Sequence, residues 1–167
     1  LGGGRVTVDG VVSPRLDLAV VAESVSASVA NQFSAGLGAE GTISGRAAIT
    51  GRSAAPAIAW QATWSGMAVA ATRASGLPGL AVSAKGSATT ANTTLDATLS
   101  GAGLTLALAG RVPFSGAGLS LSAKGTAPLA LLGASAGREL RLGGNARLDV
   151  AITGSTGAPA IAGTADL

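Results

Sequence analysis

The chain has 167 residues, of which 47% are apolar, only 2% are aromatic and 26 are glycine. Its net charge of +3 comes from scattered single residues, without the basic clusters and interleaved aromatics that nucleic-acid-binding proteins use. The chain has no histidine and no cysteine, which excludes histidine-based triads, cysteine nucleophiles, disulfides and the usual zinc sites.

From the N-terminus onward, large aliphatic residues alternate with small or polar ones, most clearly from Leu104 to Leu108. A period of two residues is typical of a β-strand with one apolar and one polar face. Helices are disfavoured, because each interior glycine costs a helix about 1 kcal/mol relative to alanine. We therefore predict an all-β fold of about eleven strands, with turns at Ser13-Pro14, Ser53 to Pro56, Pro78-Gly79, Val112-Pro113 and Gly157 to Pro159.

Two internal repeats organise the chain. In the shorter one, of about 15 residues, Ser100-Gly-Ala-Gly-Leu-Thr-Leu106 recurs as Ser115-Gly-Ala-Gly-Leu-Ser-Leu121. In the longer one, of about 103 residues, the segment 24–64 matches 127–167. The alternation breaks at Ser24 to Gly36 and at Leu129 to Gly137, which occupy the same place in the longer repeat. We predict a short helix or irregular crossing at each break.

Charged residues follow the same alternation. Lys85, Asp96 and Arg111, for example, each have the parity opposite to the large aliphatic residues of their own strands. One face of the sheet is therefore expected to carry no charge. We predict that this face forms a groove for lipid or another apolar chain, lined by Leu16, Leu18, Val20, Ile43, Ile49, Ile58, Trp60, Trp64, Val69, Leu80, Val82, Leu95, Leu99, Leu104, Leu106, Leu108, Leu119, Leu121, Leu148, Val150, Ile152 and Ile161.

Catalysis has little support in the sequence. The eight carboxylates are dispersed, and most have the parity of the solvated face. Ser83-Ala-Lys85 and Ser122-Ala-Lys124 resemble a serine–lysine pair only superficially, because both members belong to that same face. The glycines in Gly101-x-Gly103 lack the following helix of a dinucleotide-binding loop, so turn formation explains them. We predict no catalytic residue, no cofactor and no metal site.

Trp60 and Trp64 are the only tryptophans, and they share one face. Two interpretations are open. They contact acyl chains or a partner strand, or they are ordinary packing residues at the rim of the sheet.

Three runs carry a resemblance to a known family. They are Gly118 to Leu132 (GLSLSAKGTAPLALL), Leu142 to Gly154 (LGGNARLDVAITG) and Ala158 to Gly163 (APAIAG). In this order they resemble the translocation and assembly module family, TamB, within the AsmA-like group. The resemblance covers nearly the whole chain and implies that residues 1–167 are an internal part of one elongated β-sheet region.

The resemblance implies a long, curved sheet that forms a trough with an apolar concave interior. The parent protein would be anchored in the bacterial inner membrane and extend through the periplasm. Its partners would be phospholipid acyl chains, nascent outer-membrane β-barrel chains, and an outer-membrane barrel of the Omp85 type, like TamA. The implied role is non-enzymatic transport of phospholipid between the two membranes, together with assembly and secretion of outer-membrane proteins such as autotransporters.

Two alternatives remain open from sequence. A closed β-sandwich or barrel would bury the same aliphatic residues as an ordinary core. A secreted adhesin or autotransporter passenger built from Gly/Ala repeats would also be rich in short strands. Such passengers favour asparagine and aspartate ladders and polar surfaces. This chain has only three asparagine residues and a positive mean hydropathy of +0.50.

Overall fold

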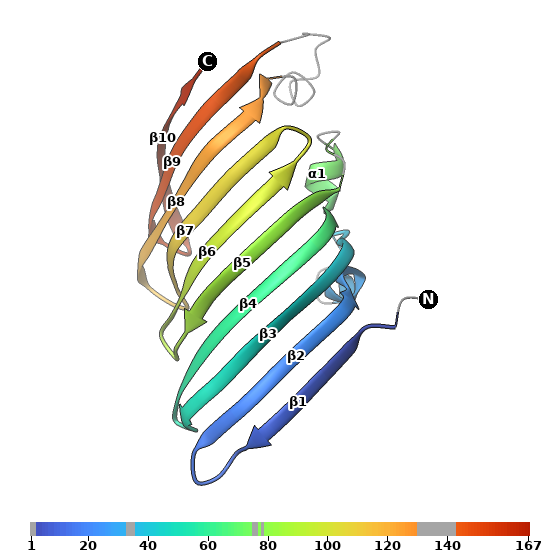
Figure 1. Ribbon diagram of the computed structural model, residues 1–167. Helices are drawn as coiled ribbons and strands as arrows, with labels where there is room; N and C mark the ends of the chain where they lie inside the picture. Colours follow the sequence, from blue (N-terminus) through green and yellow to red (C-terminus); the bar gives the residue numbers. More distant parts are fainter. Residues whose placement is uncertain (1–2, 33–35, 75–76, 78, 130–142) are drawn as a thin grey trace.

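The computed structural model describes residues 3–32, 36–74, 77, 79–129 and 143–167. They form one open antiparallel sheet of ten strands whose spatial order is the sequence order (Figure 1). The predicted all-β, curved-sheet fold is confirmed, with ten described strands instead of about eleven. The strands are β1 (Arg5–Val11), β2 (Leu16–Ser26), β3 (Glu40–Arg52), β4 (Ala55–Ala68), β5 (Leu80–Ala88), β6 (Asn92–Gly101), β7 (Leu104–Pro113), β8 (Ala117–Pro128), β9 (Asn145–Ser155) and β10 (Ala158–Asp166).

The sheet is open at both edges. Strands β1 and β10 each pair with only one neighbour and not with each other, so the sheet does not close into a barrel. Within the described residues there is also no second sheet that would complete a sandwich. The closed alternatives to a trough are therefore not what this chain adopts.

The two ends of the strands are connected differently. Short connections join β1 to β2, β3 to β4, β5 to β6, β7 to β8 and β9 to β10 at one end, which we call the tight-turn rim. At the opposite end, the crossing rim, the 3-10 helix η1 (Ala27–Gln32) joins β2 to β3 and helix α1 (Ala70–Ala74) joins β4 to β5 (Figure 1). Both helices therefore lie at the same rim. The connection from β6 to β7 at this rim is a short turn of Ala102 and Gly103.

The predicted interruptions agree with the structure in part. Helix η1 lies inside the predicted break at Ser24 to Gly36, although β2 continues to Ser26. Helix α1 was not predicted, because its five residues are too short to show a helical period. The predicted break at Leu129 to Gly137 lies outside the described residues, except for Leu129 itself.

The predicted turn at Val112-Pro113 is wrong. Both residues belong to β7, and the connection to β8 follows them. Pro113 is the last residue of the strand, where proline is tolerated because little of the hydrogen-bond ladder remains to be made. Pro56 and Pro159 likewise lie inside β4 and β10, each as the second residue of its strand.

The longer sequence repeat is visible as two hairpins with the same register. In the β3–β4 hairpin Gly51 pairs with Pro56, and in the β9–β10 hairpin Gly154 pairs with Pro159. Both glycines have the same φ of 102°, which a residue with a side chain rarely adopts. The repeated residues therefore specify the same turn at both places.

Glycines within the strands allow the sheet to bend. A Cβ on Gly110 would overlap the backbone carbonyl of Ser120, and one on Gly125 would overlap that of Thr105. Strands approach this closely where a sheet is sharply curved, and glycine is the residue that permits it. Both glycines lie on the face that carries the aliphatic residues, since each pairs with a leucine of that face.

Candidate functional site

The predicted groove residues share one face of the sheet, which we call the apolar face. Their cross-strand partners are often other members of the set: Leu99, for example, pairs with Val82 on one side and with Leu106 on the other. Val69 is the exception, because it lies in the connection between β4 and α1. The face therefore runs across the sheet from strand to strand.

Burial on the apolar face is partial and uneven. Most of its residues are half-buried, and a small core of Leu80, Leu104 and Ala127 is buried near the crossing rim. The edges are open, with Val6 on β1 60% exposed and Ile161 on β10 70% exposed. An apolar guest would therefore find the edges and the middle of this face more accessible than its crossing rim.

The two tryptophans differ in their surroundings. The Trp64 Nε1–H donates a hydrogen bond to the Glu40 carbonyl oxygen at 2.8 Å, so this indole is anchored to the neighbouring strand. The Trp60 ring lies beside Gly86 on the next strand, where an added Cβ would come within 2.9 Å of the ring. For Trp64 this favours the interpretation as a packing residue at the rim.

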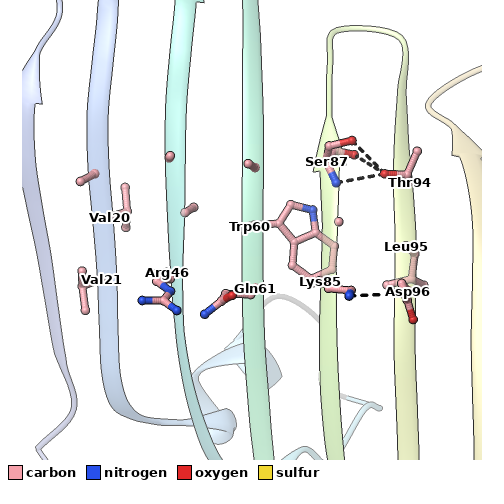
Figure 2. Close-up of a pocket in the computed structure, with 15 residues that line it drawn as sticks. Val20, Val21, Arg46, Trp60, Gln61, Lys85, Ser87, Thr94, Leu95 and Asp96 are labelled. Carbon is pink, nitrogen blue, oxygen red and sulfur yellow. Dashed lines mark hydrogen bonds and ion pairs between the residues drawn. The ribbon is translucent and has the colours of Figure 1, made fainter.

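The opposite side of the sheet, which we call the charge-bearing face, contains a depression of about 710 Å³ over β2 to β6 (Figure 2). Two cross-strand rows of this face line it, together with the apolar-face row between them. That middle row contains the predicted groove residues Val20, Trp60 and Leu95. Because the next apolar-face rows on either side contribute no lining residue, we infer that the depression opens on the charge-bearing side. The two rows are Ala19, Ala48, Ala59, Ser87 and Thr94, and Val21, Arg46, Gln61, Lys85 and Asp96.

One wall of the depression is a ladder of polar contacts. With the Gln61 amide turned so that its oxygen faces Arg46, that oxygen accepts hydrogen bonds from guanidinium Nε and Nη2 at 2.5 and 2.6 Å. On the next strands Lys85 Nζ lies 3.7 Å from a carboxylate oxygen of Asp96. A second depression of about 510 Å³ adjoins the ladder on its other side. The ladder therefore separates two shallow hollows.

The other wall has a hydroxyl pair. The Oγ atoms of Ser87 and Thr94 are 2.8 Å apart, and the Ser87 N–H donates to the Thr94 hydroxyl at 3.0 Å (Figure 2). The sequence predicted Val20, Trp60 and Leu95, which line the first depression, but it did not predict the depressions themselves. They depend on the alignment of five neighbouring strands, which a period of two residues does not specify.

The serine–lysine patterns have a structural role in the described residues. Lys124 Nζ contacts the Asp149 carboxylate at 2.7 Å, and Lys85 faces Asp96. Each lysine is thus directed at a carboxylate on the neighbouring strand. In the part of the chain that the structure describes, no three His, Cys, Asp or Glu residues are grouped to hold a metal ion.

Comparisons with known proteins give no relative: no family model, no curated protein and no solved structure matches this chain. None of the helices among the described residues has the length and hydropathy needed to cross a membrane.

Proposed function

We propose that this chain is part of a non-enzymatic periplasmic conduit or chaperone of the TamB type, whose apolar face binds phospholipid acyl chains or nascent outer-membrane protein chains. The observation that carries the proposal is an open sheet in which the charged residues of the described strands keep to one face. The other face stays half-buried, and no second sheet covers it among the residues that the structure describes. An ordinary globular sheet of this kind would bury its apolar face against another layer.

The dimensions suit a lipid guest. Ten strands spaced about 4.8 Å apart span about 45 Å across the sheet. One leaflet of a bilayer has a hydrocarbon thickness of about 15 Å, so a single acyl chain fits within the face. Movement of such a guest requires an apolar lining and no chemical step, which agrees with the lack of histidine and cysteine.

In the parent protein this sheet would lie in the periplasm, with an anchor in the inner membrane and an Omp85-type barrel as its partner in the outer membrane. These features rest on the family resemblance of the three sequence runs.

Photocrosslinking tests which face meets the guest. A photoreactive residue at Leu121 on the apolar face should capture lipid in cells, and one at the adjacent Ser120 on the charge-bearing face should not. Mass spectrometry of the crosslinked protein identifies the adduct. Equal labelling of the two positions would overturn the proposal, and capture of protein without lipid would assign the face to nascent chains.

A matched pair of substitutions in β9 tests transport. Val150→Arg places a charge on the apolar face, whereas Ala151→Arg places it on the exposed opposite face. We expect Val150→Arg to abolish transfer of fluorescent phospholipid between vesicles by the purified chain, and Ala151→Arg to leave it unchanged. Equal transfer by both variants would contradict transport along this face.

A further inference from the structure

The crossing rim over β2 to β5 is held together by contacts among the chain's own segments. The Asn31 side-chain amide exchanges two hydrogen bonds with the backbone of Ala39, at 2.6 and 3.1 Å, and Ala39 is fully buried. Arg73 of α1 contacts the Glu40 carboxylate at 2.7 Å and donates to the Gly38 carbonyl oxygen at 2.9 Å. The two helical crossings are thereby tied to the start of β3, and they occupy this side of the sheet.

The tight-turn rim is open by comparison, since neither helix lies there. Leu18, Ile49 and Ile58 form a half-buried row of the apolar face close to this rim. Val12 and Phe114, in the connections β1–β2 and β7–β8, are 63% and 58% exposed. Turns are usually built from polar residues and glycine, so exposed apolar side chains at turns are unusual. A guest on the apolar face therefore has its open approach at the tight-turn rim.

Two arginines are neighbours at this open rim. Leu16 pairs with Gly51 across β2 and β3, so Arg15 and Arg52, which are one position further out, lie side by side. Both are exposed, and neither takes part in the three ion pairs of the described residues. Asp17 is the one acid at the same end of these two strands. The ends of β2 and β3 therefore have a net positive charge.

The arginine pair is a local feature of the rim. The connections β5–β6 (residues 89–91), β7–β8 (residues 114–116) and β9–β10 (residues 156–157) contain no charged residue. An anion that reaches the tight-turn rim is therefore attracted to the ends of β2 and β3 more than to the other turns.

We propose that Arg15 and Arg52 bind the phosphate of a phospholipid whose acyl chains lie on the apolar face and point from the tight-turn rim toward the crossing rim. This inference rests on the proposed function and adds the headgroup chemistry and the orientation of the lipid. Guanidinium groups bind phosphate through paired, charge-assisted hydrogen bonds. Both arginines have the parity of the charge-bearing face, but they stand at strand ends, where a headgroup that projects past the rim into water meets them.

The dimensions give the position of the acyl-chain end. One leaflet of a bilayer has a hydrocarbon thickness of about 15 Å, which equals about four to five residues of a strand. Counted inward from Leu16 and Gly51, this length ends at the cross-strand row of Val20, Ala47 and Trp60. Trp60 is half-buried on the apolar face, so its indole should lie near the end of a bound acyl chain.

Tryptophan fluorescence tests the orientation. In the Trp64→Phe variant, Trp60 is the only tryptophan of the chain. The purified variant is loaded with phosphatidylcholine that carries a nitroxide quencher either at the end of an acyl chain or on the headgroup. We expect Trp60 to lose most of its fluorescence with the chain-end label and little with the headgroup label.

The unchanged chain provides a second measurement that needs no substitution. Trp64 lies further from the tight-turn rim than Trp60 on β4, so both tryptophans together should show the same order of quenching. Stronger quenching by the headgroup label would place the phosphate at the crossing rim and overturn the proposed orientation.

A pair of double variants tests the headgroup contact. Arg15→Gln with Arg52→Gln removes two positive charges at the tight-turn rim, and Arg5→Gln with Arg147→Gln removes two exposed ones near the crossing rim as the matched control. Titration calorimetry measures binding of short-chain phosphatidylglycerol and of diacylglycerol with the same acyl chains. The first variant should bind phosphatidylglycerol about tenfold more weakly, because each arginine near a lipid phosphate contributes about 1 kcal/mol. Diacylglycerol has no phosphate, so its binding should be the same for both variants and the unchanged chain.

The remaining outcomes separate this inference from the proposed function. If neither lipid binds the unchanged chain, the proposed function fails and the headgroup site fails with it. If both lipids bind but the two double variants bind phosphatidylglycerol equally well, the apolar face holds lipid without a headgroup site at Arg15 and Arg52. Glycerol phosphate, which lacks acyl chains, should compete only weakly. Competition as strong as that of phosphatidylglycerol would assign the arginines to free phosphate and overturn the link to lipid.

Discussion

The two faces of the sheet consist of alternate residues of the same strands, yet they differ in how they are stabilised. On the apolar face, leucine and valine side chains are half-buried to buried, and glycines allow neighbouring strands to approach closely. On the charge-bearing face, the ion pairs Lys85–Asp96 and Lys124–Asp149 stay more than half exposed. Burial of apolar area contributes much more free energy than exposed ion pairs do. The difference indicates that the apolar face contributes most of the stability of the sheet.

The largest contrast is expected within β5. Leu80 is 1% exposed in the core near the crossing rim, whereas Ser83 is exposed on the charge-bearing face. Leu80→Ala should lower the free energy of unfolding by about 3 kcal/mol, since it removes buried methyl groups and leaves a cavity. Ser83→Ala should change it by no more than about 0.5 kcal/mol. Urea unfolding of both variants measures the difference in free energy of unfolding. A similarly small loss in both variants would contradict the conclusion that the apolar face contributes most of the stability.

A smaller effect is expected where glycine permits close approach of strands. A Cβ at Gly125 would overlap the Thr105 carbonyl, whereas nothing lies within 4 Å of a Cβ at Gly157 in the β9–β10 turn. Gly125→Ala should cost about 2 kcal/mol of unfolding free energy through backbone strain. Gly157→Ala should be neutral or slightly stabilising, because it reduces the freedom of the unfolded chain. Equal stabilities of the two variants would show that the strands relax without cost.

The sequence was sufficient to predict the two-faced strands. A period of two residues decides which side chains share a face, and the predicted groove residues of the strands do lie on one face. The repeat also anticipates equivalent hairpins, since Gly51 with Pro56 and Gly154 with Pro159 keep one register.

The charge-bearing depressions could not be predicted, because they depend on how whole strands are aligned. Bulges change that alignment: the register shifts between Ala22 and Val25 in β2, and between Trp64 and Met67 in β4. Each shift comes shortly before a crossing at the crossing rim. Val69 follows the second shift and lies in the connection between β4 and α1.

The smallest effect on stability is expected from the exposed ion pairs of the charge-bearing face. A double-mutant cycle with Lys124→Ala and Asp149→Ala should give a coupling of about 0.5 kcal/mol, because both side chains are solvated. The cycle for Lys85 and Asp96 should give less, since that pair is separated by 3.7 Å instead of 2.7 Å. Both couplings should shrink in high salt, which screens exposed charges. A salt-independent coupling of about 2 kcal/mol or more would instead give the charge-bearing face a share in stability like that of the buried leucines.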